Sequence, residues 1–200
     1  MIDTKEKILL TALKLFSVRG FKAVSVNDIA SELGITKGAL YKHYKSKNDI
    51  FESIIGRMEN SDSEKAYAEG LPDVSLDKAP EKYKSVQICQ TINFARDMFR
   101  YWTEEDFPAA FRRMLTLEQY GSDKMRALYC QYLSEGPLGY LTDIFSSIRA
   151  ENARKMAIEL YAPMFLFYSV YDASSDKQSV SAEFELHLKE LSKTWKIQTN

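Results

Sequence analysis

The stretch from Ser25 to Lys47 gathers side chains that can donate hydrogen bonds to anionic oxygens or to the edges of bases. It reads SVNDIASELGITKGALYKHYKSK. Lys37 can donate to a phosphate or to guanine O6 and N7, and Thr36 can offer a hydroxyl or a methyl group. Tyr41 adds a phenol for a phosphate and a ring for a thymine methyl, and Gly38 leaves room where a backbone must come close. These residue types at this spacing suit recognition of double-stranded DNA.

Two short helices around a tight turn would present these side chains together. Ser25 can cap the first helix, with Asp28 in its first turn, and Gly34 breaks it. The outer face of the second helix, which Thr36 can cap, also carries His43. Where the next helix begins, Lys47 can help to clamp a phosphate. An apolar set locks the two helices together: Val26, Ile29, Ala30, Leu33, Ile35 and Leu40. This pattern predicts a helix-turn-helix whose second helix enters the major groove.

Helical periodicity accounts for most of the remaining chain. Asp3 and Glu6 predict the capped start of a first helix that stops at Gly20, and Ser46 and Asp49 predict the start of a fourth. That helix gives way to a loop between residues 60 and 80. Further helices are predicted near residues 81–104, 108–120, 123–134, 137–149, 152–174 and 180–197. The expected fold is all-α, with about nine or ten helices: an N-terminal three-helix helix-turn-helix domain followed by a larger helical bundle domain.

The charge of the chain is uneven along its length. The 200 residues have a formal net charge of -1, yet residues 1–50 hold nine Lys or Arg against five Asp or Glu. That part therefore carries about +4 and the remainder about −5, so only the N-terminal end is expected to meet a polyanion.

Cysteine usage and hydropathy place the chain in a reducing compartment. Cys89 and Cys130 form no CxxC motif and predict buried free thiols. The start MIDTKEK lacks the apolar core of a signal peptide, and the apolar stretch at residues 160–171 is too short to span a bilayer. We therefore expect a cytoplasmic protein that does not contact a membrane.

Five runs keep the residues and spacing of a known family. They are ALKLF at 12–16, RGF at 19–21, VNDIA at 26–30, LGITKGALYKHYKSK at 33–47 and IF at 50–51. Residues 1–51 thereby resemble the N-terminal domain of the TetR family of bacterial transcription regulators. Three positions depart mildly from the family pattern: Tyr44 stands where Phe is frequent, Ser25 where Thr is frequent, and Ile50 where Leu is usual.

The resemblance implies roles for particular residues and regions. It implies phosphate contacts for Ser25 and Lys47, and places near bases or backbone for Thr36, Lys37, Gly38, Tyr41 and His43. Residues 1–47 would be the DNA-binding domain, and residues 48–200 a helical domain for ligand binding and dimerisation. The implied partners are double-stranded DNA, a second copy of the chain and a small-molecule effector of unknown identity, with no cofactor.

The region after residue 80 is rich in aromatic residues and methionine. Core packing accounts for most such residues, but pockets for apolar effectors also form between the helices of bundles. In that second interpretation the ligand-contacting residues are Phe94, Met98, Trp102, Phe111, Tyr129, Phe165 and Tyr168. The polar residues that could orient a ligand, or could instead form surface ion pairs, are Arg96, Arg112, Arg113, Glu118 and Gln119.

The last two predicted helices each carry an apolar stripe at helical spacing. A four-helix contact between two subunits would bury both stripes, although they could instead pack within their own subunit. The interface candidates are Met156, Leu160, Phe167, Phe184, Leu188, Leu191 and Trp195.

The sequence lacks the usual signatures of an enzyme. Neither His43 nor His187 has a Glu three residues before it, as a di-metal bundle requires, and there is no phosphate loop, nucleophile elbow or zinc-spaced cluster. We predict no catalytic residue and no metal ligand. The favoured interpretation is a ligand-responsive repressor that occludes its operator. An activator of the same fold and a helical protein-interaction module without a DNA target remain the alternatives.

Overall fold

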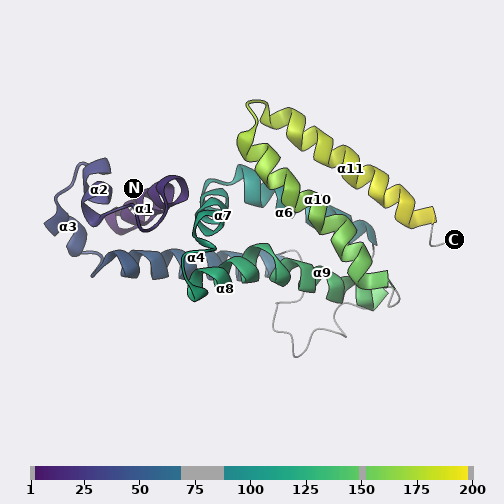
Figure 1. Cartoon of the computed structure of the whole chain (residues 1–200), viewed down its shortest axis with the longest axis horizontal. Helices are drawn as coiled ribbons and strands as arrows, with labels where there is room; N and C mark the ends of the chain where they lie inside the picture. The colour runs from purple at the N-terminus through teal and green to yellow at the C-terminus, as the bar shows by residue number, and fades with distance from the viewer. Residues whose placement is uncertain (1–2, 69–87, 149–151, 198–200) are drawn as a thin grey trace. The chain divides into compact units, whose positions relative to one another are not determined.

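A computed structural model describes residues 3–68, 88–148 and 152–197 (Figure 1). Within these ranges the chain forms helices and no strand, which confirms the predicted all-α fold. The helices are α1 (Thr4–Arg19), α2 (Val26–Glu32), α3 (Lys37–Tyr41), α4 (Lys47–Ala68), α6 (Ile88–Glu104), α7 (Asp106–Glu118), α8 (Asp123–Leu133), α9 (Glu135–Ile148), α10 (Ala153–Ala173) and α11 (Lys177–Ile197). None of those helices combines the length and apolarity needed to cross a bilayer.

The helices gather into two compact units. Unit 1 comprises Met1–Gly70 and Asp106–Tyr129, and unit 2 comprises Leu71–Glu105 and Cys130–Asn200. Unit 1 therefore joins α7, which lies far along the sequence, to the N-terminal helices. The proposed division by role into residues 1–47 and 48–200 is a separate matter and stays a prediction.

The core of unit 1 centres on α1, which packs against α4 and α7, and the two short helices join it through α2. α1 packs against α2, α4 and α7, and α2 packs against α3. The fully buried side chains include Ile8, Leu13, Phe16, Ile29, Leu40, Ile50, Ile54 and Phe111. Burying a side chain of this size stabilises a fold by about 1.5–3 kcal/mol, so this core holds the short helices that could not stand alone.

The predicted helix caps have mixed outcomes. Ser25 and Thr36 accept hydrogen bonds from the N–H groups of Asp28 and Ala39, both at 3.1 Å, which confirms the caps of α2 and α3. The capping box at the start of α1 is wrong, because Asp3 makes no side-chain cap. The carboxylate of Glu6 pairs instead with Arg57 of α4, a stronger partner for a charged group than a backbone N–H.

Several helix boundaries also differ from the prediction. α4 continues to Ala68, past the expected end near residue 60, although the polar composition there favours a loop. α7 and α9 begin two residues before Pro108 and Pro137, because a proline in the first turn of a helix loses no backbone hydrogen bond. Residues 69–87 and 149–151, which hold parts of the predicted loop and helices, lie outside the described ranges.

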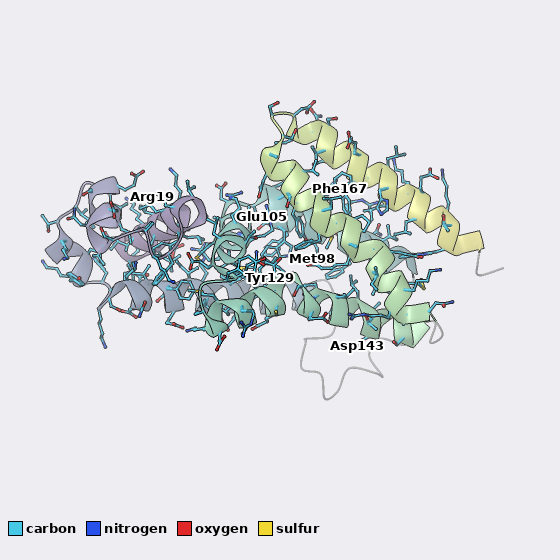
Figure 2. The ribbon with its side chains drawn as sticks, in the orientation of Figure 1. Arg19, Met98, Glu105, Tyr129, Asp143 and Phe167 are labelled. Carbon is cyan, nitrogen blue, oxygen red and sulfur yellow. The ribbon has the colours of Figure 1, made fainter. Side chains whose placement is uncertain are left out.

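Unit 2 is organised around aromatic side chains of α6, α10 and α11. Phe167 of α10, labelled in Figure 2, is one of them. The Phe99 ring lies 4.3 Å from the ring of Phe184 and 5.9 Å from that of Tyr168. At the other end of α11, the Trp195 ring lies 5.2 Å from that of Phe145, and its indole N–H donates to Glu159 at 3.0 Å. These rings form the apolar core of the bundle.

Candidate nucleic-acid interface

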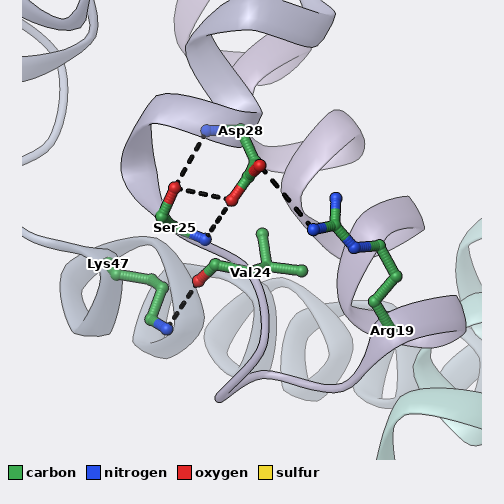
Figure 3. A network of polar contacts seen from close by, with 5 residues as sticks. All are labelled: Arg19, Val24, Ser25, Asp28 and Lys47. Carbon is green, nitrogen blue, oxygen red and sulfur yellow. Dashed lines mark hydrogen bonds and ion pairs between the residues drawn. The ribbon is translucent and has the colours of Figure 1, made fainter.

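The entry to α2 is held by a short polar network (Figure 3). The Ser25 hydroxyl accepts from the Asp28 N–H and donates to the Asp28 carboxylate at 2.5 Å, while the Ser25 N–H donates to the same carboxylate at 2.7 Å. Arg19 lies 3.6 Å from the other carboxylate oxygen. The Ser25 hydroxyl, its N–H and the Arg19 charge together hold the pKa of Asp28 below its usual value. For the predicted phosphate contact, Ser25 would have to redirect the proton that it gives to Asp28.

Lys47 braces the same turn from the start of α4. Its ammonium donates to the carbonyls of Phe21 and Val24, both at 2.7 Å, and lies 4.3 Å from the centre of the Phe21 ring. Burial lowers the pKa of Lys47, while the nearby charges of Glu118 and Asp28 act in the opposite direction. A lysine ammonium has three donors, so a third remains for the predicted phosphate contact.

The exposed side of α3 carries the groups that suit base and backbone contact. Lys37 and Tyr41 lie one turn apart, with the Lys37 ammonium 5.8 Å from the centre of the Tyr41 ring. Tyr41 is 45% exposed although it is aromatic, and Leu40 beside it is fully buried. A side chain added at Gly38 would meet only the Thr36 hydroxyl, at 3.9 Å, so packing within the chain does not require glycine there.

The seven predicted DNA-contacting residues all lie in unit 1. Ser25, Thr36, Lys37, Gly38 and Tyr41 are exposed, whereas His43 and Lys47 are half-buried. Their contact with DNA stays a prediction. Tyr44 stands at a position where the family pattern frequently has Phe. The structure accounts for the tyrosine, because the ring is buried and its hydroxyl donates to the Lys5 carbonyl at 3.3 Å.

Sequence reasoning missed the part that Glu118 plays here. The sequence indicates it only as a residue that could orient a ligand, but its carboxylate accepts a hydrogen bond from the Phe21 N–H at 2.7 Å. The two residues are 97 positions apart, and no periodic pattern connects them. The signal in the sequence that could have indicated this role is an acidic residue, Glu118, next to the apolar positions of α7.

The predicted ligand-contacting residues are divided between the units. Phe111 and Tyr129 belong to unit 1, and the other five belong to unit 2. Trp102, Phe111 and Tyr168 are buried in the core, whereas Phe94 is half-buried with its ring 5.7 Å from that of Tyr140. Phe165 is 38% exposed, so it belongs to the outer surface of α10. Met98, on α6, is half-buried.

Three further predictions for the region after residue 80 can be compared with the structure. The Nε–H of Arg96 on α6 donates to both carboxylate oxygens of Glu185 on α11, at 2.7 and 2.8 Å, which supports the ion-pair alternative. Cys130 is a half-buried free thiol rather than a buried one, and the side chain of Cys89 lies outside the described residues. In the described ranges no group of three His, Cys, Asp or Glu is arranged to hold a metal ion.

The predicted dimer interface is largely occupied by the chain itself. Met156, Leu160, Phe184, Leu188 and Trp195 are at most 3% exposed within the single chain, while Phe167 and Leu191 are half-buried. A side chain that already packs inside its own bundle cannot also form the surface offered to a second copy. This burial favours the alternative that the two stripes pack within their own subunit, and the residues that meet a second copy stay a prediction. The large apolar side chains that are exposed on the two helices are those of Ile158, Phe165, Leu166 and Val170 on α10 and Leu186 on α11.

Comparison with known sequences gives a match over the N-terminal domain. Residues 8–54 match the family described as bacterial regulatory proteins, tetR family. The HTH-type transcriptional repressor BepR of Brucella suis biovar 1 (strain 1330) is 47% identical over 55 residues, which are 28% of this chain and 26% of that protein. The chain spans between 18% and 30% of the length of the curated relatives it matches.

Comparison with solved structures extends over nearly the whole chain. The TetR-family regulator PfmR of Thermus thermophilus has a TM-score of 0.59 at 22% identity, covering 94% of this chain and 97% of that one. The regulator FadR of Bacillus subtilis, solved in complex with stearoyl-CoA, has a TM-score of 0.59 at 17% identity, covering 92% and 96%. The matched family and BepR are described as transcriptional or regulatory proteins, which agrees with the prediction that the chain is not an enzyme. Residues 8–54 of this chain are thus similar in sequence to the tetR family of bacterial regulatory proteins, and the chain has the fold of TetR-family regulators.

Proposed function

We propose that this protein is a transcriptional regulator that binds double-stranded DNA through α2 and α3. The observation that carries the proposal is the exposed face of α3, where Lys37 and Tyr41 stand on a helix held from beneath by the buried Leu40. A rigid short helix with donors on its outer side is what major-groove reading requires. The net positive charge of residues 1–50 attracts the DNA backbone.

We further propose that it acts as a homodimer on a palindromic operator. Two copies related by a two-fold axis would present two α3 helices to half-sites about one helical turn, ~34–36 Å, or a multiple apart. The surface offered to the second copy is the exposed apolar face of α10, formed by Ile158, Phe165, Leu166 and Val170. Apolar side chains at this spacing on one helix gain stability only when another surface covers them.

The proposed mode of action is repression that a small molecule relieves. A relative over the N-terminal domain is named as a repressor, and a regulator of the same fold was solved with stearoyl-CoA bound. For this chain the effector is a small molecule of unidentified structure, bound in the helical part that follows α4. Such a molecule releases DNA only if it binds the released conformation more tightly than the DNA-bound one. Because a regulator of bacterial genes works where the chromosome is, we expect the protein in the cytoplasm.

Selection of bound sites from random double-stranded DNA tests the DNA-binding proposal. We expect an enriched palindrome with two half-sites. Affinity for that site should fall steeply with salt, with a slope of about −0.9 in log K against log salt for each phosphate contacted. If no sequence is enriched and binding hardly changes with salt, the protein-interaction alternative replaces the proposal.

A further inference from the structure

The backbone N–H and the backbone carbonyl of Phe21 are each held by a charged side chain from another helix. Its N–H donates to the carboxylate of Glu118 on α7, and its carbonyl accepts from the ammonium of Lys47 on α4, both at 2.7 Å. We call this arrangement of Phe21, Lys47 and Glu118 the Phe21 clamp. All three residues belong to unit 1.

Glu118 is placed in the clamp with little freedom. Glu118 is only 7% exposed, and a carboxylate is rarely buried to this degree unless it is paired or hydrogen-bonded. Glycines border it on both sides, since a Cβ added at Gly20 or at Gly121 would lie 3.0 Å from one of its carboxylate oxygens. The fold thus keeps two side chains out of the volume that the carboxylate fills.

The clamp lies directly before the helix that begins the DNA-reading motif. Phe21 starts the turn that leads to Ser25, the cap of α2, and Lys47 also holds the Val24 carbonyl in that turn. The Phe21 ring is fixed as well, with its centre 5.1 Å from the ring centres of Phe16 and Phe51. Ser25 and Lys47, two of the residues expected to meet phosphates, are therefore oriented by a turn that Glu118 anchors.

We propose that Glu118 is a positioning residue for DNA binding: through the Phe21 N–H it fixes the turn that orients Ser25 and Lys47 towards the DNA backbone. This inference rests on the proposed function. The carboxylate makes no contact with DNA itself. It acts because an anion accepts the Phe21 N–H more strongly than a neutral group would, and because its charge favours the ammonium of Lys47 at the same turn.

The test compares Glu118→Ala and Glu118→Gln with the unaltered protein on a DNA site selected by that protein. Thr116→Ala is the matched control, because Thr116 is exposed on the same helix and its hydroxyl donates to the Arg112 carbonyl within that helix. We expect Glu118→Ala to lose about tenfold in apparent affinity, since the turn occupies its binding arrangement for a smaller fraction of the time. Glu118→Gln, which keeps an acceptor oxygen, should recover part of the loss.

Two features of the measurement separate positioning from direct contact and from unfolding. The salt dependence of affinity should keep its slope in the Glu118 variants, because no phosphate contact is removed. Hydrogen exchange of the Phe21 amide, measured in the unaltered protein and in Glu118→Gln, needs no DNA and no strongly destabilised variant. We expect protection in the unaltered protein and faster exchange in the variant.

Each outcome decides a stated point. If Glu118→Ala binds the selected site within twofold of the unaltered protein, or if the Phe21 amide exchanges as freely as an exposed amide, the positioning role is wrong. If the unaltered protein selects no DNA at all, the proposed function fails, and the exchange experiment alone still shows whether the clamp exists.

Discussion

Lys37 and Tyr41 share the exposed side of α3 but offer different chemistry. Lys37 can donate to guanine or to phosphate, whereas Tyr41 offers a hydroxyl and a ring. We expect Lys37→Ala to weaken binding to the selected site by about 1–3 kcal/mol and to relax the base preference at one position of each half-site. Tyr41→Ala should weaken binding about equally on all sequences. Both effects are measured by affinity on the selected site and on single-base variants of it.

The control for this pair is Lys189→Ala, which removes one positive charge from an exposed position on α11. It should leave both affinity and base preference unchanged. If both α3 variants bind like the unaltered protein, α3 does not contact DNA, and the assignment of the helix-turn-helix is contradicted.

The Ser25–Asp28 cap is expected to couple the stability of unit 1 to pH. Ser25→Ala should reduce the free energy of unfolding by about 1 kcal/mol, because the Asp28 N–H at the start of α2 loses its acceptor. Asp28 has a lowered pKa, so its charged form is favoured by folding. Its stabilising contribution is therefore complete above about pH 4, the usual value for Asp, and is lost as the pH falls through the lower pKa of the folded state.

Denaturant unfolding at a series of pH values measures this contribution. In Asp28→Asn the acid-dependent part of the unfolding curve should be smaller than in the unaltered protein. Ser31→Ala, which changes an exposed serine on the same helix, is the control and should unfold like the unaltered protein. An identical pH dependence in Asp28→Asn would show that Asp28 does not couple folding to protonation.

The contrast between the caps and the clamp shows which contacts a sequence reveals. Ser25 and Thr36 could be predicted as caps because each bonds to an N–H three residues away, a distance that local geometry fixes. The hydrogen bond between Glu118 and Phe21 joins positions 97 residues apart. The donor is a backbone N–H, which nearly every residue type has, so no residue type in the sequence marks it as the partner. Only the tertiary fold brings such groups together.

Glycine has three different roles in the helices and turns of unit 1, which a series of alanine substitutions can separate. Gly20 has a φ of 80° and lies against Glu118, Gly34 has a φ of 65° with open space around it, and Gly56 lies inside α4 with open space around it. Gly56→Ala should stabilise the protein by about 1 kcal/mol, because alanine favours the helix. Gly34→Ala should cost about 1–2 kcal/mol through backbone strain alone.

Gly20→Ala should be the most harmful of the three, at about 2–3 kcal/mol, because its Cβ adds a close contact with the Glu118 carboxylate to the strain of positive φ. Thermal and denaturant unfolding of the three variants measure the order. If Gly20→Ala costs no more than Gly34→Ala, the carboxylate yields easily, and the tight fit of Glu118 described above is contradicted.

At the scale of helices, the sequence predicted which helices form better than where they begin and end or which helices they pack against. The apolar spacing in α1, α2 and α4 identified each helix, and the prolines near α7 and α9 shifted only the predicted starts. The packing of α7 against α1 could not be predicted, because both helices have apolar faces that would fit many partners. This is why the composition of unit 1 emerged only from the structure.

For the molecule as a whole, α10 shows why helical periodicity alone does not identify a dimer surface. The helix is apolar on two sides: Met156, Leu160 and Met164 are buried within unit 2, and Phe165 and Leu166 are exposed. Helical periodicity identifies apolar faces but does not show which of two apolar faces the chain buries in its own core. One apolar stripe of α10 lies in the core of unit 2, and the other is exposed and is the surface that we propose for a second copy.

The proposed dimer gives a test that involves the whole molecule. Leu166 is 61% exposed on α10, and in a two-fold interface each residue is present twice. Replacing it in Leu166→Glu would place two charges in the contact and remove two apolar side chains, so the dimer should weaken on the order of 100- to 1,000-fold. Sedimentation velocity over a range of concentrations measures the shift from dimer to monomer.

Leu117→Glu is the matched control, because Leu117 is 52% exposed on α7 in the other unit. It should sediment like the unaltered protein. The monomeric Leu166→Glu should also bind a full palindrome no better than a single half-site, because the two α3 helices are no longer joined. If Leu166→Glu stays dimeric, then α10 is not the contact surface, whereas an unaltered protein that is monomeric at all concentrations would contradict the homodimer itself.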